Sequence, residues 1–352
     1  MRDRTGMDRQ HCVAALPGGQ PRIRTLHSVP PQPSPATSAA LTFPHDCTPM
    51  NATSTPGLHG RDLLLVFAII LAWAGNFLTS ALALREIPPF LFTALRFALL
   101  ALPLLFLLRR PASGQWPRLM AVSLCVGVLH FGLSFLALKM AGNLSSPAIV
   151  MQSYVPMTAL LAWWWLGERF GWRTGIAIAL SFAGVLVLGF DPLVLRNPAA
   201  LGVMLVSALF LAIGTVLMKG LRDLTVWSQQ GWMALISLLP LLAISLWREP
   251  GAIAQLAHAS PVAWMGALYA DYASSLLGHG VYYLLVQRHP VAQVTPWLLL
   301  VPVFAVGLGI AFWGDRPGVQ LWIGGAMVLG GVFTMALRAL QRSRSLIVPE
   351  EI

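Results

Sequence analysis

The chain has 352 residues, of which 57% are hydrophobic and only 10% are charged, and its formal net charge is +10. A soluble domain carries about 25% charged residues, so this composition excludes a protein that folds mainly in water. The Lys and Arg residues stand singly between apolar runs, which excludes the clustered basic face of a nucleic-acid-binding protein. Cys12, Cys47 and Cys125 have neither a disulfide pattern nor a metal-binding spacing, and we expect no cofactor and no metal.

The N-terminal segment, 1–60, differs from the remainder of the chain. It is rich in Pro, Ser, Thr, Gly and Arg and contains no long apolar run. Two interpretations stay open: a disordered N-terminal tail, or a segment upstream of a true translation start near Met50.

Apolar runs of membrane-spanning length follow from Leu63 to Leu337. Short polar or proline-bearing connections separate them, and none is long enough to form a soluble domain. The pattern predicts an all-α integral membrane protein with ten transmembrane helices, at roughly 62–83, 88–108, 119–139, 146–166, 173–190, 199–219, 227–247, 263–286, 291–313 and 319–338.

The distribution of positive charge predicts the orientation. With a cytoplasmic N-terminus, twelve Lys and Arg residues from Arg61 to Arg344 fall on the inner side, whereas Arg85, Lys139, Arg196, Arg248 and Arg316 fall on the outer side. Because positive residues are retained on the cytoplasmic side, both termini are expected to be cytoplasmic. We therefore expect a multi-pass protein of the cell inner (plasma) membrane, in contact with the lipid bilayer.

The two halves of the apolar region repeat each other. Leu166–Arg169 (LGER) corresponds to Trp313–Arg316 (WGDR) in the second half, and Gly171 corresponds to Gly318 at the same offset. The repeats are predicted at 61–193 (helices 1–5) and 194–340 (helices 6–10), before a cytoplasmic tail at 341–352. Five helices per repeat is an odd number, so the second repeat must be inserted upside down, as in many secondary transporters.

Several short motifs resemble those of one known family. Trp73-Ala-Gly-Asn76-Phe77, Leu95-Arg96-Phe97, Gly167-Glu168-Arg169 and Leu299-Leu-Val-Pro302 are similar to signatures of the EamA-type transporters, which belong to the drug/metabolite transporter superfamily. The resemblance covers about 60–340 and is nearest to exporters of O-acetylserine and cysteine. It implies ten helices, a central cavity and export of amino-acid-like metabolites.

Arg96 is expected about eight residues into helix 2, near the bilayer midplane. An Arg at this depth is costly unless it is paired or hydrated. Two readings stay open: the guanidinium faces a wet cavity and binds a substrate carboxylate, or it pairs with helix carbonyls or a nearby acid and holds the bundle together. Trp73 and Asn76 share one polar face of helix 1, and either line the same cavity or join helices.

Helices 4 and 9 carry prolines at matching positions, a pattern typical of transport sites. Gln152 and Tyr154 precede Pro156, and Trp297 precedes Pro302. The polar and aromatic residues are predicted to contact substrate and the prolines to bend the helices during gating. Kinks without any ligand role are the alternative.

Helices 3 and 8 contain titratable residues. His130 in helix 3 is expected to be a packing residue more often than a proton carrier. In helix 8, Asp271 and His279 lie two turns apart and are candidates for proton coupling. The alternative is that Asp271 lies in the headgroup region or pairs with an Arg such as Arg96. Glu168 and Asp315 are expected to end helices 4 and 9 and to pair locally.

A secondary exporter of small, amino-acid-like metabolites, working by alternating access, is the function that these features favour. An intramembrane enzyme is the alternative, and a non-transporting membrane partner protein is another; no His-Glu-x-x-His, Gly-x-Ser-x-Gly or acid-rich metal cluster supports the enzyme. Small residues in helices 5 and 10 suit close packing and predict either a scaffold or the face of a homodimer.

Overall fold

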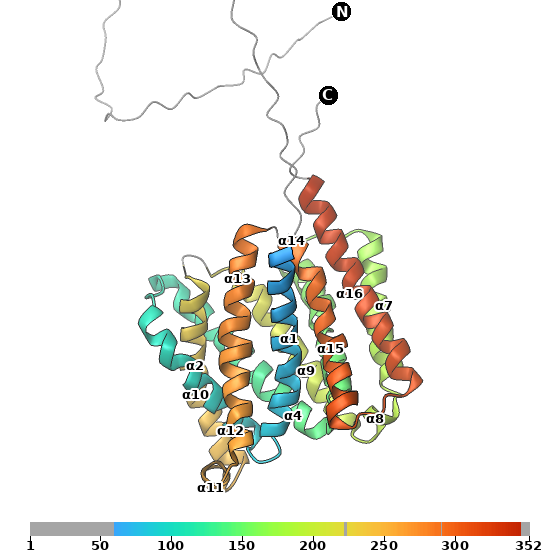
Figure 1. Cartoon of the computed structure of the whole chain (residues 1–352). Coiled ribbons are helices and arrows are strands. Elements are labelled where there is room, and N and C mark those ends of the chain that lie inside the picture. The colour runs from blue at the N-terminus through green and yellow to red at the C-terminus, as the bar shows by residue number, and fades with distance from the viewer. Residues whose placement is uncertain (1–59, 222–223, 290, 346–352) are drawn as a thin grey trace, which may run out of the picture. The chain divides into compact units, whose positions relative to one another are not determined.

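The structure, a computed structural model, describes residues 60–221, 224–289 and 291–345, and these ranges form a bundle of helices without strands (Figure 1). The all-α prediction is confirmed for this part of the chain. The predictions for residues 1–59 and for the C-terminal segment 346–352 lie outside the described ranges.

The first half of the bundle runs from Gly60 to Leu188. Its elements are α1 (Gly60–Ala83), α2 (Pro89–Leu104), η1 (Leu105–Leu107), η2 (Ser113–Gln115), α3 (Trp116–Val122), η3 (Ser123–His130), α4 (Phe131–Ala141), α5 (Ser145–Met151), α6 (Tyr154–Leu166) and α7 (Trp172–Leu188). Pro89 begins α2, where its fixed φ suits the first turn and its missing N–H is not needed. Gly142 and Gly167 follow α4 and α6 with positive φ angles of 64° and 67°, which glycine adopts without strain.

The second half begins after the short α8 (Pro192–Leu195). Its elements are α9 (Pro198–Met218), α10 (Val226–Arg248), α11 (Ala252–Ala257), α12 (Pro261–Leu268), η4 (Tyr269–Gly278), α13 (His279–Arg288), α14 (Val291–Val294), η5 (Thr295–Leu299), α15 (Leu300–Leu308), η6 (Gly309–Trp313) and α16 (Val319–Ser345). The last helix thus continues past the predicted boundary at residue 340.

Within the described ranges, seven helices are long and apolar enough to cross a membrane. They are Gly60–Ala83, Pro89–Leu107, Ser113–Ala141, Pro198–Met218, Val226–Arg248, Pro296–Trp313 and Val319–Gln341. The predicted span at 146–166 is not among them because its helix is interrupted between α5 and α6. The predicted span at 263–286 contains Asp271 and His279, which lower its hydropathy.

The helices α7 and α16 lie side by side in Figure 1 and cross at residues that are counterparts in the two repeats. The Ser181 hydroxyl donates to the carbonyl of Val328, which is its own repeat counterpart. On either side, Gly184 approaches Gly324 and Gly331 approaches Ala177. Gly324 and Gly331 are the repeat counterparts of Ala177 and Gly184, so the two contacts exchange when the repeats are exchanged, as in a two-fold interface. Because the small residues of α7 and α16 meet each other here, they support the scaffold interpretation of these helices.

Wide, π-helical turns occur at matching positions of the two halves. The segment η3 begins at Ser123 and η4 begins at Tyr269, an offset one shorter than the one that relates LGER to WGDR. Such turns leave backbone carbonyls without the usual helical partner and are frequent at functional sites. Both segments contribute to the cavity described below.

Candidate functional site

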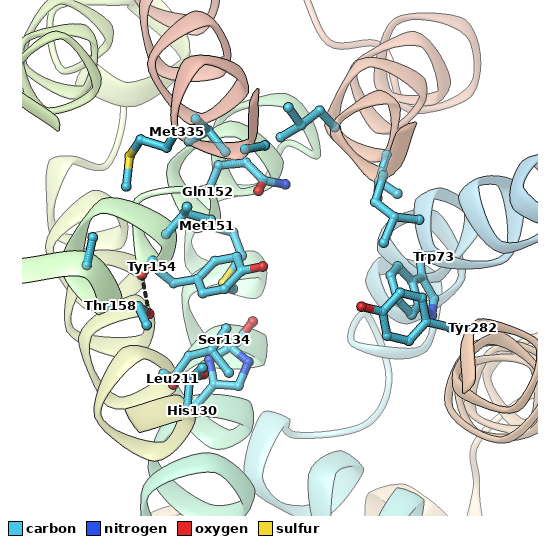
Figure 2. Close-up of a pocket in the computed structure, with 18 of the residues that line it drawn as sticks. Trp73, His130, Ser134, Met151, Gln152, Tyr154, Thr158, Leu211, Tyr282 and Met335 are labelled. Carbon is cyan, nitrogen blue, oxygen red and sulfur yellow. Dashed lines mark hydrogen bonds between the residues drawn. The ribbon is translucent and has the colours of Figure 1, made fainter. Parts of the chain in front are cut away.

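A cavity of about 820 Å³ lies within the bundle. Figure 2 shows Trp73 of α1 and Tyr282 of α13 on one wall, facing Gln152 and Tyr154 of the α5–α6 break across open space. The break therefore turns polar side chains into the cavity from a segment that is otherwise apolar. Asn76 lines the cavity as well, so four of the predicted substrate-contacting residues share this site with Arg96.

Arg96 lies at this cavity with only 5% of its surface exposed. Its Nη2 donates to the carbonyl of Ala270 at 3.0 Å and to the Ser275 hydroxyl at 2.9 Å, whereas its Nε is buried without a hydrogen-bond partner. The guanidinium carbon lies 4.8 Å from the ring centroid of Phe135 and 5.5 Å from that of Phe131. Arg96 thus lines the cavity and is also held by a helix carbonyl, and binding of a substrate carboxylate stays a prediction.

The wide turn η4 supplies the carbonyls that orient this wall. Besides Ala270, the carbonyl of Ser274 accepts from Trp73 Nε1 at 3.0 Å, and His279 Nδ1 lies 2.9 Å from the carbonyl of Ser275. The rings of Trp73 and His279 are 5.1 Å apart. Side chains of the cavity wall therefore satisfy backbone acceptors of η4 and are held in position by them.

One end of the cavity is lined by charged residues. They are Glu168, Arg169, Lys219 and Arg338, which lie at or after the C-terminal ends of α6 and α9 and in the last turns of α16. Lys219 Nζ lies 2.7 Å from Glu168 Oε1, and both side chains are about half exposed, at 49% and 54%. We regard this end as the mouth of the cavity.

The opposite end is closed by contacts between the two halves. Asp315 Oδ2 accepts from the backbone N–H groups of Leu144 and Ser145 at 3.0 and 2.9 Å and from the Ser145 hydroxyl at 2.6 Å. Trp313 Nε1 donates to the carbonyl of Gly142 at 3.0 Å. Local pairing, expected for Glu168 and Asp315, is wrong for both: each binds a residue more than 50 positions away in the chain, because the ends of α6 and η6 meet other segments of the bundle.

An apolar cluster lies behind these closing contacts. It includes the buried side chains of Leu84, Ile87, Phe92, Phe135 and Leu144. Phe135 of this cluster also lines the cavity, so apolar packing continues from the cavity wall to the residues beside the closing contacts.

The other predicted residues are placed differently. His279 lines the cavity, whereas Asp271 is buried beside it, is 1% exposed, and has no hydrogen-bond partner at Oδ2. Asp271 and Arg96 form no ion pair within 4.0 Å. Pro156 and Pro302 are each the third residue of their helices, α6 and α15, and both are buried outside the cavity wall. Trp297 is 44% exposed and does not line this cavity.

Sequence reasoning missed several wall residues. Phe131 and Phe135 lie one helical turn apart on α4 and face Arg96, and Thr158 extends the wall formed by Tyr154. Phe131 is three positions from Ser134 and four from Phe135, and His130 is four from Ser134. This helical spacing could have indicated a shared face. Within the described ranges, no group of three or more His, Cys, Asp or Glu residues could hold a metal ion.

Comparison with known proteins agrees with this architecture. Residues 61–190 and 199–337 both match the model of the EamA-like transporter family. A "Probable amino-acid metabolite efflux pump" of Escherichia coli (strain K12) is 27% identical over 281 residues, covering 78% of this chain and 94% of that protein. A protein of the same description from Salmonella typhimurium (strain LT2) is 30% identical over 283 residues, with the same coverage.

One solved crystal structure shares the fold. It covers 80% of this chain and 98% of its own, with a TM-score of 0.52 and 19% sequence identity. The two family matches correspond to the two halves that α7 and α16 relate by internal symmetry. The chain belongs to the EamA-like transporter family.

Proposed function

We propose that this protein is a secondary transporter that exports small metabolites bearing a carboxylate, amino-acid-like compounds among them, by alternating access. The observation that carries the proposal is Arg96, a permanent cation that is almost fully buried and lines the cavity within the bundle. A guanidinium presents paired donors that match a carboxylate, and the unpartnered Nε leaves donor capacity for a ligand. The descriptions of the two efflux pumps above support the same class of solute.

Ten transmembrane spans in two inverted repeats are part of this proposal. The seven long apolar helices, the shorter α7, and the interrupted segments α5–α6 and α12–α13 together make ten. The antiparallel crossing of α7 and α16 supports the inversion. The mouth carries Arg169, Lys219 and Arg338, which the charge count assigns to the cytoplasm, so the cavity faces the cytoplasm if the protein lies in the inner membrane.

Proton coupling is the proposed source of energy. His279 contacts Trp73 in the cavity wall. Asp271 lies in η4, directly after Ala270, whose carbonyl accepts from Arg96. A proton on either group would change the charge balance around Arg96 and thereby its affinity for an anion. The breaks before Pro156 and Pro302 are the proposed bending points.

Export assays in cells test the proposal. Cells that overproduce the protein are challenged with a panel of amino-acid-like metabolites, and the intact compound is measured in the medium. Arg96→Ala is expected to reduce export at least about tenfold, because a charge-assisted hydrogen bond contributes about 1.5–3 kcal/mol. The matched control is Arg196→Ala, which removes an exposed arginine outside the cavity and should leave export unchanged.

Unchanged export by Arg96→Ala at equal membrane abundance would refute the role of Arg96. A chemically altered product in the medium would instead favour the intramembrane enzyme.

A further inference from the structure

The cavity wall holds the His279 ring in one tautomer. Its Nδ1 lies 2.9 Å from the carbonyl oxygen of Ser275, four residues earlier in the chain. A carbonyl oxygen can only accept a hydrogen bond, so Nδ1 carries the proton. A second positive charge beside Arg96 would be unfavourable, and the ring is therefore neutral at neutral pH. A neutral imidazole has one N–H, which leaves Nε2 as a nitrogen that can accept but cannot donate.

This acceptor is open to a ligand in the cavity. Among the described residues, none donates a hydrogen bond to Nε2 of His279. The neighbouring Trp73 has a single N–H, and it already donates to the carbonyl of Ser274 at 3.0 Å. His279 lines the cavity and is only half-buried, so a donor group of a bound solute can reach Nε2.

Aromatic rings beside this acceptor favour a positively charged donor. The ring centroid of Trp73 lies 5.1 Å from that of His279 and 6.1 Å from that of Tyr282. The faces of Trp and Tyr rings attract ammonium groups. Arg96 is close by, because its Nη2 donates to the hydroxyl of Ser275, the residue whose carbonyl holds His279. An ammonium group at His279 and a carboxylate at Arg96 would thus lie near each other, as the two charged ends of an amino acid do.

The charges of the cavity wall favour a zwitterion over a simple cation. Among the described lining residues, the one acidic side chain is that of Glu168, which is paired with Lys219 at the mouth. Arg96 would repel an amine that has no carboxylate of its own. A solute that carries both groups brings its own counter-charge to the guanidinium.

His130 provides a second imidazole for comparison. Its Nδ1 lies 3.0 Å from the Ser207 hydroxyl, and that hydroxyl already donates to the carbonyl of His130 at 2.8 Å. Nδ1 is therefore the donor here as well, and Nε2 is again an acceptor. Figure 2 shows His130 on the wall opposite Trp73 and Tyr282, so this acceptor lacks the aromatic surroundings of His279.

We propose that Nε2 of His279 binds the amino group of the solute while Arg96 binds its carboxylate. His279 is then a specificity-determining residue that makes the cavity select amino acids in their zwitterionic form over carboxylic acids that lack an amino group. This inference rests on the carboxylate site proposed above, and it adds how the second charged group of the solute is recognised.

Matched pairs of ligands test the inference by calorimetric titration of the full chain in detergent. The pairs are alanine and propanoate, leucine and 4-methylpentanoate, and phenylalanine and 3-phenylpropanoate, and the second member of each lacks only the amino group. The measured quantity is the ratio of the two affinities within a pair. For the pair that binds most tightly, the amino acid should bind the parent protein at least about tenfold better, as expected for a charge-assisted hydrogen bond.

Two substitutions at His279 separate binding from a structural role. His279→Asn keeps an amide N–H near the position of Nδ1, which can still donate to the carbonyl of Ser275, but it removes the acceptor at Nε2. The affinity ratio should fall to about one, while the affinity for the acid without an amino group stays as in the parent. His279→Gln, whose amide oxygen can reach the position of Nε2, should keep part of the preference.

His130→Asn is the matched control. It makes the same substitution in the same cavity on the opposite wall and should leave the affinity ratio unchanged. Equal affinities within every pair for the parent protein would overturn the inference about His279 alone, and so would a full preference for the amino acid in His279→Asn or its loss in His130→Asn. Failure of both members of all three pairs to bind the parent protein would overturn the proposed carboxylate site and, with it, the proposed function.

Discussion

The crossing of α7 and α16 makes a sharp prediction for two neighbouring glycines. A Cβ atom added at Gly331 would lie 2.5 Å from the carbonyl oxygen of Ala177, about 0.9 Å short of the 3.4 Å at which ordinary contact begins. The same atom added at Gly330 would meet nothing within 4 Å. Because the obstacle at Gly331 is backbone, the two helices must move apart in Gly331→Ala.

The free-energy difference between the two variants isolates this collision. Both substitutions gain the same helix propensity, up to about 1 kcal/mol, so that contribution cancels. Overpacking costs about 1–3 kcal/mol, which corresponds to about 5- to 150-fold in the unfolding equilibrium constant.

The assay is denaturant unfolding of the purified protein in detergent micelles, followed by tryptophan fluorescence. Gly331→Ala should unfold at a lower denaturant concentration than Gly330→Ala, and Gly184→Ala should resemble Gly331→Ala because it is the repeat counterpart. Equal midpoints for all three variants would show that α7 and α16 do not cross at these residues and would refute the two-fold relation of the halves.

Three further predictions concern the cavity and the closed end. Ser275→Ala removes one acceptor of the Arg96 guanidinium but leaves the carbonyl of Ala270, so KM for a carboxylate solute should rise about fivefold, as for a net loss of about 1 kcal/mol; an unchanged KM would show that Ser275 does not position Arg96. Asp271→Asn should make export insensitive to an imposed proton gradient, measured in vesicles with a pH jump, whereas lost abundance with unchanged pH dependence would assign Asp271 a structural role. At the closed end, the backbone N–H and the hydroxyl of Ser260 donate to Glu86 and lower the pKa of its carboxyl. This stabilisation is present above the unfolded pKa of the Glu86 carboxyl, about 4.3, and is lost as pH falls through the lower folded pKa. Glu86→Gln should therefore reduce the fall in melting temperature between neutral and acidic pH. An unchanged fall in melting temperature would contradict the assignment.

The sequence predicted those features that depend on local composition. Apolar length located the helices, and the cost of a charge in lipid singled out Arg96, because both properties can be read from a few neighbouring residues. The repeat of Glu168 and Asp315 was also visible in the sequence.

Contacts between distant segments could not be predicted in the same way. The three bonds to Asp315 join residues about 170 positions apart, and the sequence alone does not reveal which helix end meets which. Trp297 illustrates the same limit. Its position before Pro302 predicted a substrate contact, yet the orientation of η5 leaves it outside the cavity in this conformation.

Calorimetric titration of the purified protein tests the central claim most directly, that Arg96 binds the carboxylate of the transported solute. The solute identified by the export panel and its methyl ester, which lacks the negative charge, are titrated into the parent protein and into Arg96→Ala. The acid should bind the parent at least about tenfold more tightly than the ester does, and Arg96→Ala should remove that preference. Equal affinities of acid and ester for the parent protein would contradict the account.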